Sequence, residues 1–529
     1  MKATVFDDPV VGAVASAEAE IGVVDRRLVD RVPARLGEMM ERLGIITAAD
    51  ALLSRYEQDL GDPRRIGEIL VEHGLATPEQ VAEALRLQLG APRPNADRSQ
   101  PPRLDTRAER RRRNVISIAL FSIGMFSVAT VSVISGGGGR WYGFGALALL
   151  TAKFIGSVRY RPATTDPPLD TRVGLIVCFY NEDPEAFRRC LTSIARQTHQ
   201  PDEIWVIDDG SLTDDCLRIA TGLFGDRTDA VVHRLERNGG KRHAQSYALE
   251  RTTCDIVITI DSDTELDESA IAEGLRPFAD PRVNAVTGNV RALNHDTNLL
   301  TRLIDLRYAN AFLFERAAYS TVGSVVCCCG SLSFYRTAVV RQHLADFVSQ
   351  TFLGVPVQFG DDRRMTQYAL LSGRAVLQDT SVAYTLVPER IGHFRRQQLR
   401  WNKSFFRESL WTLQHFGMRR WPFWISYAEL AIWLVFSVTL INAVYIRQPL
   451  TGELLPWQYV FYGVALAYAR NVRYFGRQRA SFRFQLATFA LAPLYTLLHV
   501  LLLTPLRIYA LLTLRRGHWG TRARVEVQA

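Results

Sequence analysis

The sequence predicts an α/β domain with a mostly parallel sheet, inserted between transmembrane helices and preceded by a small all-α domain. Three observations carry this prediction. Short apolar runs alternate with amphipathic segments between residues 173 and 260, which is typical of a parallel sheet. Apolar stretches long enough to cross a bilayer lie on both sides of this region. A repeated motif occupies the N-terminal part of the chain.

A chain of 529 residues exceeds what one hydrophobic core usually organises, so we expect two or three folded domains. The local composition divides it as follows: a tail over 1–30, a helical repeat over 31–90, a linker rich in Pro and Arg over 91–113, two transmembrane helices over 114–160, a cytosolic domain over 161–394, an interfacial helix region over 395–421, three or four transmembrane or interfacial helices over 422–514, and a C-terminal tail over 515–529.

The N-terminal repeat consists of two units. An Arg-x-Gly-Glu motif at Arg35 recurs thirty residues later at Arg65, and each unit reads as helix, glycine-ended turn, helix, with Thr47 and Thr77 as expected N-caps. The repeat resembles the tandem N-terminal domain of type II secretion and pilus ATPases, whose paired motifs can bind cyclic di-GMP. The resemblance implies an effector site made of Arg35, Gly37, Gln58, Arg65, Gly67 and Gln88. A helical docking module is the alternative.

The apolar stretches predict a multi-pass membrane protein. Residues 115–135 carry no charge, and residues 141–158 carry only Lys153. The glycines at 136–139 lack the Lys-Ser/Thr ending of a phosphate loop, so they predict a hairpin turn between two spans. Further segments at about 423–446, 457–469 and 484–514 raise the expected number of spans to five or six.

The basic residues predict the orientation in the membrane. Arginines fill positions 110–113 before the first span, and residues 470–483 form a basic loop after the fourth. By the positive-inside rule, the N-terminus and the α/β domain face the cytoplasm at the inner (plasma) membrane. Lipid-flanking arginines also explain the formal net charge of +9. No pattern typical of nucleic-acid binding accompanies them, and no cleavable signal peptide is recognisable.

The α/β region contains a regular alternation of elements. Strand-like runs lie at 173–177, 203–207, 230–235 and 255–260, with helical segments at 184–196, 215–223 and 242–251 between them. A fifth strand-like run at 325–334 includes Cys327, Cys328 and Cys329. All seven cysteines of the chain fall in this region, and we expect them to be reduced. The three adjacent ones lack metal-ligand spacing, so a buried or site-lining role is favoured.

Four short motifs follow one another along the α/β region: Asp208-Asp209-Gly210-Ser211, Asp261-Ser262-Asp263, Gly360-Asp361-Asp362 and Gln397-x-x-Arg400-Trp401. Each acidic motif comes after an apolar run, the third after residues 352–359. Their carboxylates are therefore expected at strand ends, where open α/β sheets bind ligands. A lone Asp-Asp-Gly is usually a solvated turn. The order of the set is what indicates a functional site.

The acidic motifs suit transfer of a sugar from a nucleoside diphosphate. Asp263, with Asp261, offers hard oxygen ligands to a divalent cation that would neutralise the diphosphate. A second carboxylate must deprotonate the acceptor hydroxyl, and Asp362, with Asp361 beside it, suits that role.

The basic and aromatic residues complete this hypothesis. Arg400 could clamp the diphosphate, while Trp401 offers a flat apolar face to the acceptor sugar. Lys241 could contact the nucleotide. The helix expected over 395–415 would lie at the membrane surface. A surface helix of the soluble domain, whose tryptophan only packs, is the alternative.

Residues 172–522 resemble the processive family 2 glycosyltransferases, and in particular hyaluronan synthases. Besides the four motifs, the resemblance rests on Tyr180-Asn181-Glu182, Gly239-Gly240-Lys241-Arg242, Arg363 and Trp519-Gly520-Thr521-Arg522. It implies a GT-A-like domain, Mg²⁺ or Mn²⁺ at Asp261 and Asp263, Asp362 as the base, and Gln397, Arg400 and Trp401 at the acceptor end. Nucleotide-sugar binding is implied for Tyr180, Asn181, Glu182, Asp208, Asp209, Lys241, Arg242 and Asp261. The Cys328-Cys329-Gly330-Ser331 segment departs from the Cys-Ser-Gly-Pro-like stretch of the family.

The resemblance also implies substrates and partners. UDP-N-acetylglucosamine and UDP-glucuronate are the favoured donors, and the partners are the growing polysaccharide and the lipid bilayer. A chitin-like synthase with one donor is the first alternative. A catalytically silent envelope scaffold or cyclic di-GMP receptor is the second.

Overall fold

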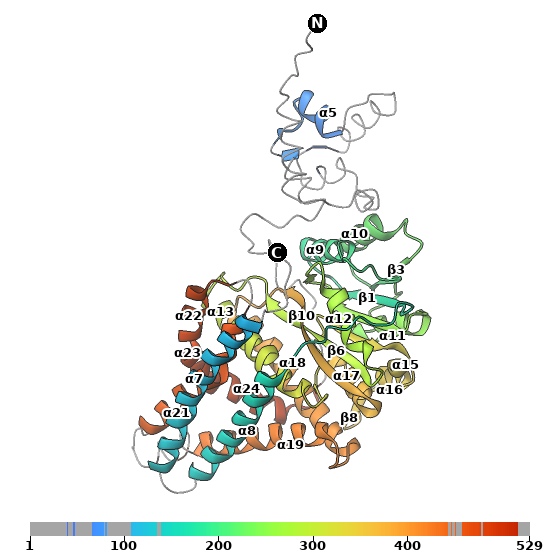
Figure 1. The fold of residues 1–529 in the computed structure, drawn as a ribbon. Helices are drawn as coiled ribbons and strands as arrows, with labels where there is room; N and C mark the ends of the chain where they lie inside the picture. The colour runs from blue at the N-terminus through green and yellow to red at the C-terminus, as the bar shows by residue number, and fades with distance from the viewer. Residues whose placement is uncertain are drawn as a thin grey trace.

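The computed structural model describes residues 40, 46–47, 66–78, 80–81, 107–134, 139–442, 446, 450, 457–477 and 480–516. A sheet domain lies beside a group of long apolar helices (Figure 1). The first repeat unit lies almost entirely outside the described residues, as does the Trp519 to Arg522 motif. The same holds for the predicted effector residues Arg35, Gly37, Gln58, Arg65 and Gln88.

The sheet has eight strands in the order β3-β2-β1-β4-β7-β6-β10-β5. Their bounds are β1 (Val173–Phe179), β2 (Glu203–Asp208), β3 (Ala230–Arg234), β4 (Ile256–Asp261), β5 (Thr264–Leu266), β6 (Val283–Ala292), β7 (Ser333–Arg336) and β10 (Arg374–Thr385). Strands β1 to β4 pair in parallel, as do β6 and β10, whereas β7 and β5 run antiparallel to their neighbours. The predicted α/β class with a mostly parallel sheet is confirmed.

Helices cover both faces of this sheet (Figure 1). They are α9 (Pro184–Ala195), α10 (Asp215–Phe224), α11 (Lys241–Arg251), α12 (Ala270–Leu275), α15 (Thr337–Arg341), α16 (Leu344–Ser349) and α17 (Asp361–Ser372). Successive strand residues point to opposite faces, so Phe334 belongs to one buried core and Tyr335 to the other. The three helices predicted between the first four strands are therefore confirmed, and each buries its apolar side on the sheet.

Two predicted strands are wrong. Residues 352–359 form a short hairpin of β8 (Thr351–Phe352) and β9 (Val355–Pro356), because Leu353 and Gly354 adopt positive φ and turn the chain. Asp361 and Asp362 consequently lie on the first turn of α17, not at the end of a sheet strand. Most of 325–334 is irregular, and only β7 at its end joins the sheet.

The long helices largely follow the predicted apolar stretches. They are α7 (Arg107–Ile134), α8 (Gly139–Arg159), α19 (Trp421–Leu440), α21 (Trp457–Asn471), α22 (Phe482–Ala490), α23 (Ala492–Leu498) and α24 (Thr504–Leu512), with a π-helical turn, η5 (His499–Leu503), before α24. Within the described residues, three helical stretches are long and apolar enough to span a membrane: Glu109–Thr130, Trp421–Leu440 and Phe482–Leu512. The total of five or six spans stays a prediction.

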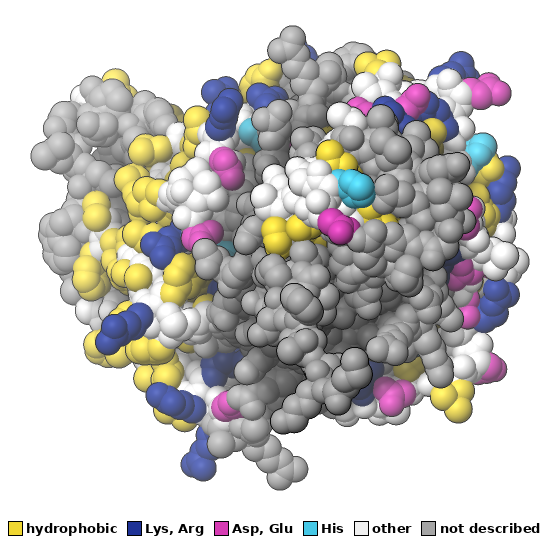
Figure 2. Space-filling model, turned by 90° about the horizontal axis from the view of Figure 1, so that it is seen from above, with side chains coloured by type: hydrophobic (Ala, Val, Ile, Leu, Met, Phe, Trp, Pro, Cys, Tyr) yellow, Lys and Arg dark blue, Asp and Glu magenta, His cyan; other side chains and the backbone are white. Residues whose placement is uncertain are grey.

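The last stretch remains nearly continuous despite its two prolines. Pro493 and Pro505 each lie in the first turn of a helical segment, α23 and α24, where the missing amide hydrogen leaves no helical hydrogen bond unmade. The group of long helices also presents large apolar side chains to the outside, among them Phe126, Leu434, Val438, Leu501 and Leu512. Figure 2 shows such side chains gathered on one side of the molecule. An apolar surface of this kind suits contact with lipid.

Two helices connect the sheet domain to the long helices. The first runs from α13 (Leu299–Ala309) through a π-helical turn, η2 (Asn310–Arg316), into α14 (Ala317–Ser320). Its residues Leu306 and Phe314 share a buried cluster with α7 and α21. The second is α18 (Ile391–His415), which contains the Gln-x-x-Arg-Trp motif and confirms the helix predicted over 395–415.

The second repeat unit has the predicted helix, turn and cap. Helix α5 (Ile66–Glu72) ends before Gly74, whose φ of +70° is the left-handed value expected after a helix. The Thr77 hydroxyl accepts from the Gln80 amide, and the Gln80 side chain accepts from the Thr77 amide. Thr77 therefore caps the following helix as predicted. Gly67 is buried on α5.

Candidate active site

A cavity of about 1060 Å³ lies between the sheet domain and the long helices. It brings together most of the predicted site residues from all parts of the α/β region: Asn181, Glu182, Lys241, Asp261, Asp263, Asp361, Asp362, Gln397, Arg400 and Trp401. Tyr180, Asp208, Asp209 and Arg242 are not among the residues that line it. The cavity continues past the acidic motifs to residues of α19, α21, α23 and α24.

Strand register places the first acidic residues. In the parallel ladder Phe179 of β1 pairs with Asp208 of β2, and Cys178 pairs with Asp261 of β4. The carboxyl ends of three neighbouring strands therefore meet at one edge of the sheet, as the sequence predicts. Asp263 follows two residues after Asp261 and lines the cavity beside it.

Asp208 and Asp209 support the loops around this edge. The buried Asp208 carboxylate accepts hydrogen bonds from Arg234 Nε at 2.6 Å and from the Ser211 amide at 2.9 Å. Asp209 accepts from the amides of Gly239 and Gly240 at 2.9 and 2.8 Å, and burial raises the pKa of its carboxyl. A contact of either with the nucleotide stays a prediction.

Arg242 does not line the cavity. Its guanidinium group is buried, donates to the carbonyl oxygen of Phe347 at 2.9 Å and lies 5.0 Å from the centre of the Phe347 ring. These contacts hold α11 against the chain that leads to α17. A contact of Arg242 with the nucleotide stays a prediction.

Lys241 connects two of the acidic motifs. Its ammonium group lies 2.5 Å from Asp261 Oδ1 and 3.5 Å from Asp361 Oδ2. Burial alone would lower the pKa of Lys241, but the two carboxylates outweigh it and the pKa is raised. Ser331 donates to the other oxygen of Asp261 at 3.1 Å. A Cβ atom at Gly330 would lie 3.4 Å from both Asp261 oxygens, so the loop after the cysteines packs closely on this carboxylate.

The donor set suits a divalent cation shared with a substrate. Asp261 and Asp263 supply hard oxygen ligands beside the open cavity. The described residues contain no cluster of three or more His, Cys, Asp or Glu side chains that could enclose a metal ion. A cation bound by two carboxylates would keep positions for phosphate oxygens and water, as Mg²⁺ often does.

Glu182 and Asn181 join the first strand's loop to its neighbours. Glu182 accepts from the Ser262 hydroxyl at 2.6 Å, which connects the Tyr-Asn-Glu and Asp-x-Asp motifs. The Asn181 backbone has φ of 46°, and its side-chain oxygen accepts from the Leu212 amide at 2.8 Å. Both residues line the cavity.

Asp362 has the environment of a general base. Its Oδ1 accepts from the Arg363 amide at 2.7 Å, while the Cys327 thiol lies 3.8 Å from its Oδ2. Burial first and the charge of Asp361 second raise the pKa of Asp362 to about 6. A carboxylate with a raised pKa is a stronger base that is still mostly ionised at neutral pH.

The Gln-x-x-Arg-Trp motif lines the same cavity from α18. The Trp401 side chain is 47% exposed, and its ring centre lies 6.5 Å from that of Tyr308. Gln397 Oε1 is buried and accepts no hydrogen bond from the described residues. An aromatic face and an unsatisfied amide oxygen at one wall suit a sugar, whose hydroxyl groups can donate to that oxygen.

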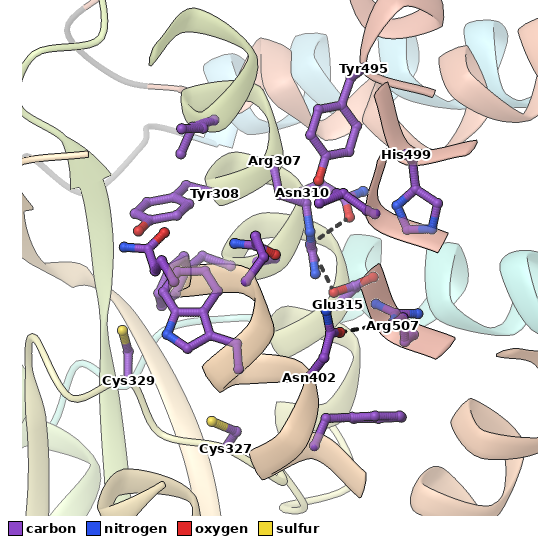
Figure 3. Close-up of a pocket in the computed structure, with 18 of the residues that line it drawn as sticks. Arg307, Tyr308, Asn310, Glu315, Cys327, Cys329, Asn402, Tyr495, His499 and Arg507 are labelled. Atoms are coloured by element: carbon purple, nitrogen blue, oxygen red, sulfur yellow. Dashed lines mark hydrogen bonds and ion pairs between the residues drawn. The ribbon is translucent and has the colours of Figure 1, made fainter. Parts of the chain in front are cut away.

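The sequence did not identify the polar cavity residues on the connecting helix that runs from α13 to α14. Glu315 bonds Arg307 and Arg470 at 3.2 Å each, and Arg316 donates to the Cys327 carbonyl oxygen at 3.0 Å. Figure 3 shows several polar residues around the cavity: Arg307, Asn310, Glu315, Tyr495, His499 and Arg507. A π-helical turn changes which side chains face inward, and π turns often mark functional sites. No local sequence signal predicts such a turn.

Comparisons with known proteins give a family and several relatives. Residues 175–344 match the family model described as glycosyl transferase family 2. The hyaluronan synthase of Streptococcus pyogenes is 37% identical over 427 residues, covering 78% of this chain and 96% of that protein. An N-acetylglucosaminyltransferase of Azorhizobium caulinodans is 34% identical over 365 residues, covering 67% and 88%. A solved mannosyltransferase from Pyrobaculum calidifontis aligns with a TM-score of 0.48 at 20% identity, covering 74% of this chain and 99% of that chain. The family match and the 37% identity to hyaluronan synthase show that this chain belongs to glycosyl transferase family 2, as a relative of the hyaluronan synthases.

Proposed function

We propose that this membrane glycosyltransferase joins UDP-N-acetylglucosamine and UDP-glucuronate into a hyaluronan-like polysaccharide and passes the product through its own helices. One observation carries the proposal: the cavity that holds the acidic motifs continues between the long helices. A growing chain that starts at the acidic motifs would therefore have space ahead of it.

The residues support an inverting transfer. Asp261 and Asp263 would hold Mg²⁺ or Mn²⁺, which would neutralise the leaving diphosphate. Asp362 would take the proton from the acceptor hydroxyl as that oxygen attacks the anomeric carbon. Attack from the side opposite the diphosphate inverts the configuration at that carbon. Arg400 would stabilise the departing charge, and Trp401 would support the acceptor sugar.

The charges along the cavity support an anionic product. Near the donor end the lining is mainly acidic, with Lys241 as its cation and Glu182, Asp261, Asp263, Asp361 and Asp362 as its carboxylates. The remaining charged lining consists of the cations Lys153, Arg307, Arg316, Arg363, Arg400, Arg470 and Arg507, with only Glu315 and Glu429 as acids. Excess positive charge attracts an anion. A neutral chitin-like polymer would gain nothing from it.

The alternatives rest on narrower grounds. A single-donor synthase is favoured by the likeness to N-acetylglucosaminyltransferases, which is weaker in identity and coverage than the likeness to hyaluronan synthases. A silent scaffold would not need an intact site. Asp263, Asp362, Arg400 and Trp401 nevertheless all line the same cavity.

Membranes that contain the full-length protein would be incubated with Mn²⁺ or Mg²⁺ and with each labelled donor alone or both together. The expected result is a long product only with both donors, degraded by hyaluronidase and resistant to chitinase. Membranes with Asp362→Asn serve as the control. A long, chitinase-sensitive product from UDP-N-acetylglucosamine alone would replace this proposal with the single-donor alternative.

A further inference from the structure

Arg507 is held in the cavity wall by Asn402 and Phe405, which lie one and four residues after Trp401. Its Nε donates to Asn402 Oδ1 at 2.9 Å, and its guanidinium group lies 5.8 Å from the centre of the Phe405 ring. Asn402 and Phe405 belong to α18, whereas Arg507 belongs to α24. Figure 3 shows Asn402 and Arg507 facing each other beside the cavity. The guanidinium group is therefore fixed by α18, one helical turn from the acceptor wall.

Arg507 forms no ion pair with any described residue. The two carboxylates in this part of the cavity already have partners: Glu315 bonds Arg307 and Arg470, and Glu429 bonds Tyr319 and Lys153. Glu429 acts on Arg507 only as a nearby charge. Arg507 is partly buried and lines the cavity, and a partly buried guanidinium group without a bonded counter-ion favours a ligand that brings one.

A second arginine lies against the same ring. The guanidinium group of Arg363, next to the proposed base, lies 5.6 Å from the centre of the Phe405 ring. It too forms no ion pair with the described part of the chain. Two cations therefore lie beside the Phe405 ring: Arg363 from the catalytic domain and Arg507 from the long helices. The positive charge gathers at the point where a product leaving Trp401 would pass.

We propose that Arg507, positioned by Asn402 and Phe405, binds the carboxylate of a uronate unit in the growing chain. The inference rests on the proposed function and adds the residue that recognises the acidic sugar. The planar guanidinium fork can donate two parallel hydrogen bonds to a carboxylate. Because Nε already bonds Asn402, the two terminal nitrogens are the donors for the ligand. A neutral polysaccharide offers no carboxylate to this position.

The test compares full-length Arg507→Gln, Arg507→Lys and the wild type. Arg483→Gln is the matched control, because Arg483 is an exposed arginine on α22 and does not line the cavity. Two quantities are measured: the affinity of the purified protein for a hyaluronan hexasaccharide and for a chitin hexasaccharide, and the product length made from both donors.

Arg507→Gln is expected to weaken binding of the hyaluronan hexasaccharide by about tenfold or more, as for loss of a charged hydrogen-bonded pair. Binding of the neutral hexasaccharide should change less than about twofold, and the product should be shorter. Arg507→Lys should recover part of both losses, and Arg483→Gln should match the wild type.

Equal weakening of both hexasaccharides by Arg507→Gln would overturn the assignment, because a folding or packing defect does not distinguish the ligands. Unchanged binding of both would also overturn it. Failure of the proposed function is seen separately, in the wild type. If the wild type does not incorporate glucuronate, both the proposed function and the role of Arg507 are wrong. If the wild type incorporates glucuronate but Arg507→Gln does not change hexasaccharide binding, only the role of Arg507 is wrong.

Discussion

Gly360 packs directly on Ser404, so closely that a Cβ atom at position 360 would lie 2.3 Å from the Ser404 hydroxyl oxygen. Gly360 also has φ of +90° and precedes the first turn of α17. Ser404 lies three residues after Trp401 on α18. This contact therefore helps to set the distance between the proposed base and the acceptor wall, together with the buried ion pair between Arg364 of α17 and Glu408 of α18.

Gly360→Ala should lower the rate of UDP release by about tenfold or more, because displacement of catalytic groups by an ångström has large kinetic effects. Gly354→Ala is the matched control. Gly354 has φ of +77° but no atom within 4 Å of an added Cβ. Alanine at this position therefore introduces the backbone strain of a positive φ without a steric collision. Thermal unfolding would show whether both variants fold. Equal rate losses in the two variants would contradict the importance of the Gly360 to Ser404 contact.

Asp263→Asn and Asp362→Asn should each lower the rate of UDP release by roughly a hundredfold or more, on the order expected for loss of a metal ligand or a general base. The two variants should differ in a second measurement. Binding of Mn²⁺ in the presence of UDP should weaken in Asp263→Asn and persist in Asp362→Asn. Wild-type rates in both variants would contradict the assigned roles.

Local patterns predict the elements near the first two acidic motifs well. Strands β1 to β4 are apolar runs, and the parallel ladder then places Asp208 and Asp261 at one sheet edge. Strands β6 and β10 escape detection because buried polar residues interrupt them, such as Asn289 in β6 and Gln378 in β10. These residues form hydrogen bonds across the sheet domain that depend on the completed fold.

The wall formed by the connecting helix and α24 depends on tertiary contacts. Arg307 and Arg507 are far apart in sequence, and neither lies in a motif that the sequence makes recognisable. Their common position follows from packing of α13 and α24 around α18 and the neighbouring long helices. Arginine in an apolar helix does mark a functional position in many membrane proteins. The arginine at position 507, within an apolar stretch, could therefore have identified this position from the sequence.

The N-terminal repeat leads to one prediction about regulation, and this prediction rests on the sequence motif alone. If the two Arg-x-Gly units bind cyclic di-GMP, calorimetry on the purified full-length protein should give a dissociation constant of tens of micromolar or tighter, on the scale of about −6 kcal/mol or more favourable. Arg65→Ala should weaken binding, because each arginine would contact a phosphate. His73→Ala, outside the proposed ligand set, is the control. An absence of binding would favour the helical docking module.

The rate of transfer should fall as the pH drops through about 6. The proposed base works as a carboxylate, and burial together with Asp361 raises the pKa of Asp362 to about 6. Protonation below that pH removes the base, so the acid limb of the rate profile should have its midpoint there. Asp361→Asn removes a neighbouring negative charge and should move this midpoint to lower pH. Asp280→Asn is the control, because hydrogen bonds from Arg282 hold the pKa of that distant carboxyl down to about 2. A midpoint that stays fixed in Asp361→Asn while shifting in Asp280→Asn would exclude Asp362 as the group that titrates.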